Sequence, residues 1–174
     1  MPPPRTSRTR IIQSWDTASK AGPENDFSVC TTWQEEKGSP HSTYYLLHVE
    51  RGRFDFPSLR AKVLDLAERF KPTRLLIEDT GAGTGLIQDL RHSPCHAIPV
   101  KPEQDKVARM AIQSAKFGSG QVFLPKEAPW LAAFEAELFA FPGSKHDDQV
   151  DSVSQALGYQ GSSYDTTMRW VDGS

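Results

Sequence analysis

Acidic residues end two short segments of the sequence that have the composition of β-strands. Asp16 follows segment 11–15, which is β-branched and aromatic, and Asp79 follows segment 74–78, which is largely aliphatic. A right-handed crossover can make two such strands parallel neighbours, and their carboxyl ends then lie at the same edge of the sheet. Two carboxylates at that edge are roughly 5 Å apart, the spacing between strands. Because they repel each other, the pair favours a bound cation.

A third set of acids lies near the carboxyl end of the chain, within residues 146–152 (His-Asp-Asp-Gln-Val-Asp-Ser). On a helix, Asp148 and Asp151 are one turn apart, as are Asp147 and Asp151. One helical face can therefore present two carboxylates to the same metal centre. Oxygen-only ligands favour Mg²⁺ or Mn²⁺ over zinc. A pair of such ions, held about 3.5–4 Å apart, activates water and stabilises the leaving oxygen in phosphodiester hydrolysis.

The elements that position these acids begin with three predicted strands. Segments 11–15, 27–33 and 43–49 are rich in β-branched and aromatic residues, whereas 20–26 and 35–42 contain turn-forming residues. Short turns between consecutive strands predict an antiparallel meander. This meander forms the first half of the expected domain.

The spacing of apolar residues changes to a helical period after the third strand. Leu59, Val63, Leu66 and Phe70 recur at that period, which predicts a helix over 57–70. The expected elements that follow are strands at 74–78, 96–100 and 122–124, a short helix ending near 91, and helices over 104–117, 130–139 and 146–158. This order predicts an α/β fold with a mixed β-sheet of about five strands and helices on both faces. It is the element order of a ribonuclease H-like domain.

Composition and charge restrict the class of protein. The chain has 174 residues, of which 37% are apolar, and this size suits one domain with a sizeable core. Its formal net charge is −2, so overall charge alone does not indicate a nucleic-acid-binding protein. The two cysteines, Cys30 and Cys95, form no paired motif, which argues against a disulfide scaffold and suits a reducing cytosol. The sequence contains no apolar run long enough to cross a membrane and no signal peptide, so we expect no membrane association.

Four stretches of the chain resemble motifs of the nuclease domain of phage terminase large subunits. They are residues 15–20 (Trp-Asp-Thr-Ala-Ser-Lys) with 25–29 (Asn-Asp-Phe-Ser-Val), 77–83 (Ile-Glu-Asp-Thr-Gly-Ala-Gly), 105–109 (Asp-Lys-Val-Ala-Arg) with 120–125 (Gly-Gln-Val-Phe-Leu-Pro), and 146–152. Each motif alone is weak, but the four occur in the order of the family between about residues 11 and 159. The resemblance covers nearly the whole body of the chain and implies the ribonuclease H-like fold.

The resemblance also implies a function, cofactors and partners. Proteins of this family cut concatemeric double-stranded DNA with Mg²⁺ or Mn²⁺ during genome packaging, so we expect a two-metal endonuclease acting in the cytoplasm of the bacterial host. They also carry an N-terminal packaging ATPase and work with a portal and a small terminase subunit. The chain contains no Gly-Lys dipeptide and so no phosphate-binding P-loop, and we expect it to be the nuclease part alone.

We expect three parts in the chain: a flexible arm over residues 1–9, the nuclease domain over 10–160 and a flexible tail over 161–174. The arm is rich in proline, arginine and threonine, and the tail carries no clear hydrophobic period. The body between them shows no internal repeat.

The acids at matching motif positions form the expected site. Asp16, Asp79 and Asp148 are the expected catalytic residues. With Asp151, they are also the expected metal ligands. An aspartate after a strand is by itself more often a turn former or a helix cap, so the joint pattern carries the prediction. Lower-ranked supporting roles are expected for Asp147, His146 and Asp26.

DNA contacts are expected from basic residues near these acids. Lys106 and Arg109 are three residues apart and share one face of the predicted helix over 104–117, from which they can contact phosphates. Lys20, in the first turn, can also approach a phosphate. An ordinary solvated helix face and an exposed turn lysine are the respective alternatives.

Two other functions are consistent with the same residues. A Holliday-junction resolvase shares the fold and the acid-rich last helix, and it would prefer branched DNA. A DNA-packaging docking module that has lost catalysis would keep the fold, although the intact set of acids argues against it. A sugar-kinase or actin-like ATPase would need a glycine-bearing phosphate loop after the first acid, which Thr17 and Ala18 do not provide.

Overall fold

The molecule is built on one mixed β-sheet, and the computed structural model describes residues 1–18 and 27–160. The strands are β1 (Thr9–Asp16), β2 (Ser28–Glu36), β3 (Thr43–Gly52), β4 (Arg74–Glu78), β5 (Ala97–Val100) and β6 (Val122–Phe123). Within the described residues, their order across the sheet is β5-β4-β1-β2-β3-β6. β1, β2 and β3 form the predicted antiparallel meander. β4 pairs parallel to β1, β5 to β4 and β6 to β3.

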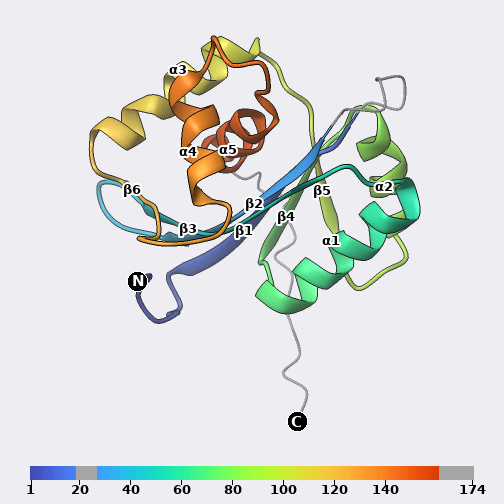
Figure 1. Cartoon of the computed structure of the whole chain (residues 1–174). Coiled ribbons are helices and arrows are strands. Elements are labelled where there is room, and N and C mark those ends of the chain that lie inside the picture. The colour runs from blue at the N-terminus through green and yellow to red at the C-terminus, as the bar shows by residue number, and fades with distance from the viewer. Residues whose placement is uncertain (19–26, 161–174) are drawn as a thin grey trace.

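Helices cover both faces of the sheet (Figure 1). They are α1 (Phe56–Phe70), α2 (Ala82–Leu90), α3 (Lys106–Gly118), α4 (Leu131–Ala140) and α5 (Asp148–Gly158). α1 and α2 pack on one face around Trp15, Leu75 and Ile77, and the other three pack on the opposite face around Leu76 and Val153. The predicted α/β fold is therefore confirmed, and the sheet has six strands where about five were expected.

Local sequence signals set the crossover from β3 to β4. The Asp55 carboxylate accepts a hydrogen bond from the Ser58 N–H (2.9 Å) and caps α1, and Pro57 lies in its first turn. α1 ends at Phe70, and its C-cap Lys71, directly before Pro72, has a left-handed φ of 51°. The helix returns the chain so that β4 lies parallel to β1, which brings the carboxyl ends of these two strands together.

Buried hydrogen bonds anchor α5 over β1 and β2. The Ser152 hydroxyl donates to the Ser14 carbonyl oxygen (2.7 Å) and accepts from the Thr31 N–H (3.1 Å). The Ser14 hydroxyl donates in return to the Ser152 carbonyl oxygen (2.8 Å), and Gln155 Nε2 donates to Ser14 Oγ (2.9 Å). All four residues are buried, so losing one of these partners would leave polar atoms unsatisfied. The bonds fix the position of α5 relative to the end of β1.

The amino-terminal residues contact the body of the domain. β1 begins at Thr9, and Arg5 Nη2 donates to the Phe70 carbonyl oxygen (3.0 Å). The expected tail, 161–174, lies outside the described residues, and the three-part division of the chain stays a prediction. Among residues 1–18 and 27–160, no helix is long and apolar enough to cross a membrane.

Candidate active site

The carboxyl ends of β1 and β4 bring two acidic side chains to the same face of the sheet. Trp15 lies opposite Ile77 in the parallel register, so the next residues along, Asp16 and Glu78, are also neighbours. The Ser14 side chain points to α5, and Asp16, two residues later, points to the same face. Both acids therefore face the helix that carries the third acidic motif.

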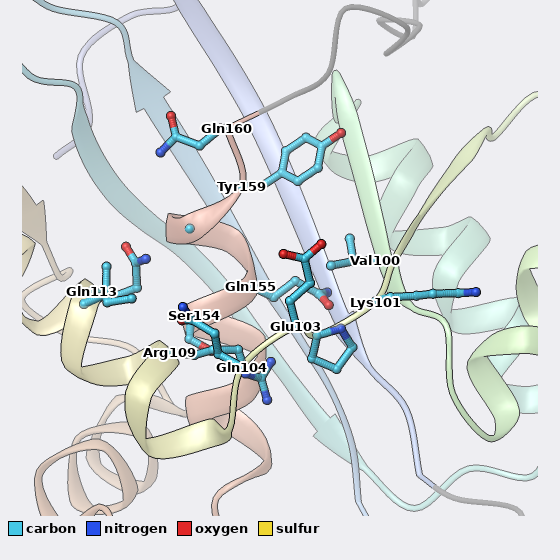
Figure 2. A pocket seen from close by; sticks show the side chains of 13 residues that line it. Val100, Lys101, Glu103, Gln104, Arg109, Gln113, Ser154, Gln155, Tyr159 and Gln160 are labelled. Atoms are coloured by element: carbon cyan, nitrogen blue, oxygen red, sulfur yellow. The ribbon is translucent and has the colours of Figure 1, made fainter.

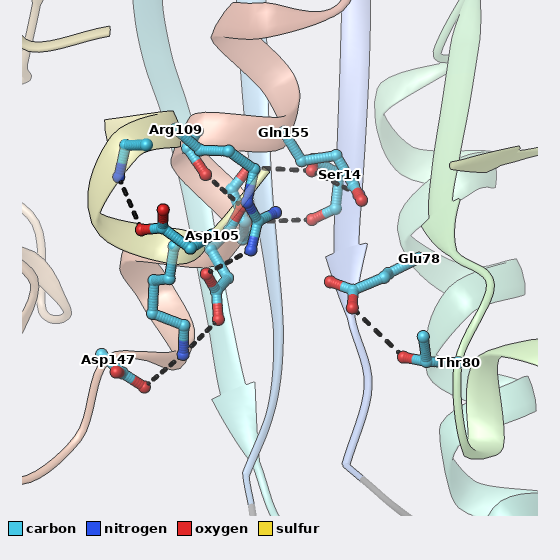
Figure 3. A network of polar contacts seen from close by, with 12 residues as sticks. Ser14, Glu78, Thr80, Asp105, Arg109, Asp147 and Gln155 are labelled. Atoms are coloured by element: carbon cyan, nitrogen blue, oxygen red, sulfur yellow. Dashed lines mark hydrogen bonds and ion pairs between the residues drawn. The ribbon is translucent and has the colours of Figure 1, made fainter. Parts of the chain in front are cut away.

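Glu78, and not the expected Asp79, is the acid that the register of β4 places beside Asp16, whereas the role expected for Asp79 stays a prediction. Consecutive residues of a strand point to opposite faces. The Asp79 carboxylate accepts a hydrogen bond from the Thr84 hydroxyl (2.8 Å) in α2, which packs on the face opposite α5. The Glu78 carboxylate accepts a hydrogen bond from the Thr80 hydroxyl (3.2 Å) and points toward β1 and α5 (Figure 3).

The amino-terminal end of α5 adds two further acids. Asp148 is its first residue, and Asp151 lies one turn later. The Asp151 side chain is only 8% exposed and binds Lys106 Nζ (2.6 Å) and Arg109 Nη2 (3.2 Å). Asp147, which precedes the helix, also binds Lys106 (2.7 Å). The basic face of α3 is therefore not a solvated face, because it is turned toward the acids of α5 (Figure 3).

Burial and neighbouring carboxylates disfavour the charged forms of three of these acids. Burial raises the pKa of Asp16 well above its usual value. The charges of Asp151, Glu78 and Asp148 raise this pKa further, and the charge of Lys106 lowers it. Burial also raises the pKa values of Asp148 and Asp151. We call Asp16, Glu78, Asp148 and Asp151 the acidic cluster.

The acidic cluster has the donor chemistry of a divalent-cation site. Its potential ligands are all carboxylate oxygens, which Mg²⁺ and Mn²⁺ prefer, and an added positive charge relieves their repulsion. Lys106 supplies one such charge, since burial alone would lower its pKa but hydrogen bonds to Asp147 and Asp151 raise it. In residues 1–18 and 27–160 as they stand, no three His, Cys, Asp or Glu side chains are close enough to hold a metal ion. The residues present fit such an ion, with the Lys106 ammonium as its stand-in.

The remaining predicted site residues lie around the cluster or outside the described chain. His146 precedes α5, and its ring lies edge-on to that of Phe27 with the centroids 5.5 Å apart. Its charge opposes the burial that raises the pKa of Asp148. Asp26 and Lys20 lie outside the described residues, so their expected roles stay predictions.

A groove of about 720 Å³ adjoins the acidic cluster. It lies between α3, α5 and the segment 100–104 (Figure 2). Polar side chains such as Ser154 and Gln155 line it, together with Arg109, which also binds the cluster. No local sequence pattern indicates this groove, because its walls come from elements far apart in the chain.

The fold is similar to that of solved terminase nucleases. The large terminase nuclease of thermophilic phage G20c, with bound magnesium, is 17% identical with a TM-score of 0.68, over 88% of this chain and 82% of that one. The nuclease domain of the Thermus phage P74-26 large terminase is 17% identical with a TM-score of 0.63, over 88% and 81% of the two chains. The Mn-soaked, inhibitor-bound terminase nuclease domain of human cytomegalovirus is 14% identical with a TM-score of 0.53, over 86% and 81%.

Sequence comparison identifies the family. No curated protein matches the chain in sequence. Residues 13–159 match the family described as the terminase RNaseH-like domain. This match covers most of the chain, and all four motif stretches and the acidic cluster lie inside it. The chain therefore belongs to the family of terminase ribonuclease H-like domains.

Proposed function

We propose that this domain is a divalent-metal-dependent endonuclease that cuts concatemeric double-stranded DNA in a phage genome-packaging motor. The observation that carries the proposal is the acidic cluster, to which β1, β4 and α5 all contribute carboxylates. Two Mg²⁺ or Mn²⁺ ions bound there would activate a water molecule and stabilise the leaving oxygen. Family membership supports the proposal, as do the magnesium of the G20c nuclease and the manganese of the cytomegalovirus nuclease.

Asp16 is the central ligand in this proposal. It is the residue whose pKa is raised by burial and by three other acids of the cluster. Glu78 holds the neighbouring position on β4, and the Thr80 hydroxyl that donates to it (3.2 Å) orients its carboxylate. Asp148 and Asp151 approach from the amino-terminal turn of α5.

Lys106 and Arg109 have two successive roles in this proposal. Without metal, both neutralise Asp151. With metal bound, the carboxylates would hold the ions, and the two basic side chains would be free to contact phosphates beside the cut. The groove next to Arg109 offers the DNA backbone space on that side.

The same proposal sets the partners of the domain. We expect it to work with an N-terminal packaging ATPase domain, a portal and a small terminase subunit in the cytoplasm of the bacterial host. Because the net charge of −2 is unfavourable for binding DNA, the ATPase domain would supply much of the affinity for DNA. Family membership favours packaging over junction resolution.

Plasmid cleavage by the purified domain tests the proposal. Supercoiled DNA should be nicked or linearised with Mn²⁺ or Mg²⁺ and should remain intact with EDTA. Asp16→Asn should abolish cutting, whereas the control Asp65→Asn, an exposed position on α1, should cut normally. Cutting that persists in EDTA would contradict the metal mechanism. Absence of cutting with every ion would favour the docking-module alternative, and cutting confined to four-way junctions would favour a resolvase.

A further inference from the structure

A row of residues across the sheet leads from the acidic cluster to an arginine. Asp16 of β1 lies opposite Val29 of β2, and Val29 lies opposite Arg51 of β3. Opposed residues on neighbouring strands point to the same face, so Arg51 shares the α5 face with Asp16. The two residues are two strands apart, which corresponds to roughly 10 Å between their Cα atoms.

The Arg51 guanidinium rests on an aromatic ring at the same end of the sheet. Its central carbon lies 3.8 Å from the centroid of the Phe27 ring, a close cation–π contact. Phe27 directly precedes β2, and its ring is itself packed edge-on against His146 (5.5 Å). The stacking holds the guanidinium in place and leaves the N–H groups along its edge for other partners.

Arg51 differs from the other basic residues near the cluster. Lys106 and Arg109 are both bound to carboxylates. In the part of the chain that the structure describes, no carboxylate lies within ion-pair distance of Arg51, and its buried Nε has no hydrogen-bond partner. Its charge still opposes the burial that raises the pKa values of Asp148 and Glu137. A positive charge that is near two acids but bound to neither is available to an anion.

We infer that Arg51, held by Phe27, binds a phosphate of the DNA strand that is being cut, on the Asp148 side of the acidic cluster. A guanidinium offers a planar fork of N–H donors that matches two phosphate oxygens. Because the stacking already orders this fork, binding costs little further conformational entropy. The inference rests on the proposed nuclease function and adds a phosphate-binding residue to Lys106 and Arg109, from β3 and not from α3.

A structural role for Arg51 is the competing explanation, in which its charge only holds the carboxylates of Asp148 and Glu137 in place. The two explanations predict different responses to metal. Loss of a structural counter-charge would disturb Asp148 and raise the Mn²⁺ concentration needed for binding. Loss of a phosphate-binding cation leaves the ligands in place and removes a repulsion of the incoming ion. Mn²⁺ binding then stays the same or tightens while DNA binding weakens.

DNA binding by matched variants tests the inference. The affinity of a short fluorescent duplex is measured by anisotropy in EDTA over a salt series. Arg51→Ala should weaken binding about 10- to 100-fold and reduce the slope of log affinity against log salt by about one. Arg51→Lys should keep the slope and lose part of the affinity, because lysine lacks the planar fork. Arg60→Ala, on α1 where Arg60 pairs with Asp89, is the control and should bind like the wild type.

Two further measurements complete the test. Phe27→Leu should weaken DNA binding less than Arg51→Ala, because it removes the stacking ring and keeps the charge. Melting temperatures measured across a Mn²⁺ titration should give Arg51→Ala a midpoint no higher than that of the wild type. Unchanged DNA affinity and salt slope would overturn the inference, as would a raised Mn²⁺ midpoint. If Arg51→Ala does not fold, Arg51→Lys and Phe27→Leu are used in its place. DNA affinities equal to that of the wild type in both variants would then overturn the inference.

The binding assay requires no cleavage, so the two proposals fail separately. A plasmid left uncut, together with the predicted loss of binding in Arg51→Ala, would remove the nuclease proposal and leave the phosphate site. A plasmid that is cut with Mn²⁺, together with unchanged binding in Arg51→Ala, would remove only the phosphate site.

Discussion

Glu78 and Asp79 are adjacent acids on opposite faces of the sheet, so substituting each of them gives a matched pair. Glu78→Gln removes a charge from the acidic cluster. Asp79→Asn removes a charge outside the cluster, from a carboxylate that accepts a hydrogen bond from Thr84. We expect Glu78→Gln to slow Mn²⁺-dependent plasmid nicking by at least about 100-fold, the upper end of the loss seen for residues behind a metal ligand. Asp79→Asn should nick at close to the wild-type rate. The reverse result would return Asp79 to the ligand set.

The sequence could not distinguish these two acids, and the reason is physical. Residues 75–77 are all apolar because β4 lies between β1 and β5 and is covered by helices on both faces. A strand buried on both faces has no alternation of polar and apolar residues from which the direction of the next side chain could be predicted. The motif placed an acid at the end of β4, and only the register with β1 identifies it as Glu78.

Asp16 couples the acidic cluster to the pH dependence of stability. Burial raises its pKa in the folded protein, so folding without metal favours its protonated form. Protonated Asp16 contributes fully to the free energy of unfolding below its unfolded-state pKa. This contribution is lost as the pH rises through its folded-state pKa. Asp16→Asn carries no such proton. In EDTA at neutral pH its melting temperature should therefore exceed that of the wild type, by about 2–4 °C for each kcal/mol gained.

The difference between these two proteins should shrink as the pH falls, because a protonated Asp16 resembles asparagine in charge. Thermal unfolding measured from about pH 4 to pH 8 in EDTA checks both points. Asp65→Asn, at an exposed position, should follow the wild type throughout. An Asp16→Asn protein that is less stable than the wild type at neutral pH would contradict the raised pKa.

The helices α3 and α5 meet through the ion pairs of Lys106 with Asp147 and Asp151. Lys106→Met keeps the length of the side chain and removes its charge. We expect this variant to melt earlier than the wild type in EDTA, because the acids lose a counter-charge. It should bind Mn²⁺ several-fold more tightly, since no ammonium competes with the ion, and the effect is modest for a partly exposed pair. Melting temperatures across a Mn²⁺ titration test this, with the exposed Lys126→Met as control. Equal midpoints of the Mn²⁺ titration in the variant and the wild type would contradict competition between Lys106 and the ion.

The elements could be predicted more fully than their packing. The helix expected over 57–70 is α1, Phe56–Phe70, because an aspartate cap and a following proline mark its ends. The helix expected from 146 begins at Asp148, so His146 and Asp147 precede it. The spacing of Lys106 and Arg109 predicted that they share a helix face, but not that this face binds α5. That contact joins residues about 40 positions apart in the chain, and no local pattern reports on it.

Carboxylates and cations from β1, β3, β4, α3 and α5 share one edge of the sheet. Arg51 of β3 lies two strands from Asp16, and Lys106 and Arg109 of α3 pair with Asp151. Without metal, the carboxylates of this edge would repel DNA phosphates, and the α3 cations Lys106 and Arg109 are paired with acids. In the proposed mechanism, metal binding would reverse both effects, because it would neutralise the cluster and free Lys106 and Arg109. DNA and metal binding should therefore be coupled.

Coupling of this kind is reciprocal, which gives it a strict test. The factor by which a divalent ion tightens DNA binding must equal the factor by which DNA tightens binding of that ion. We expect a factor of about 10, or about 1.4 kcal/mol, within the usual range for coupled sites. Ca²⁺, which also prefers oxygen ligands, serves as the ion. Anisotropy of a labelled duplex gives DNA affinity with and without Ca²⁺ at matched ionic strength, and calorimetry gives Ca²⁺ affinity with and without DNA. Glu78→Gln should reduce both factors together, whereas DNA affinity that is independent of Ca²⁺ would show that the acidic cluster does not face the bound phosphates.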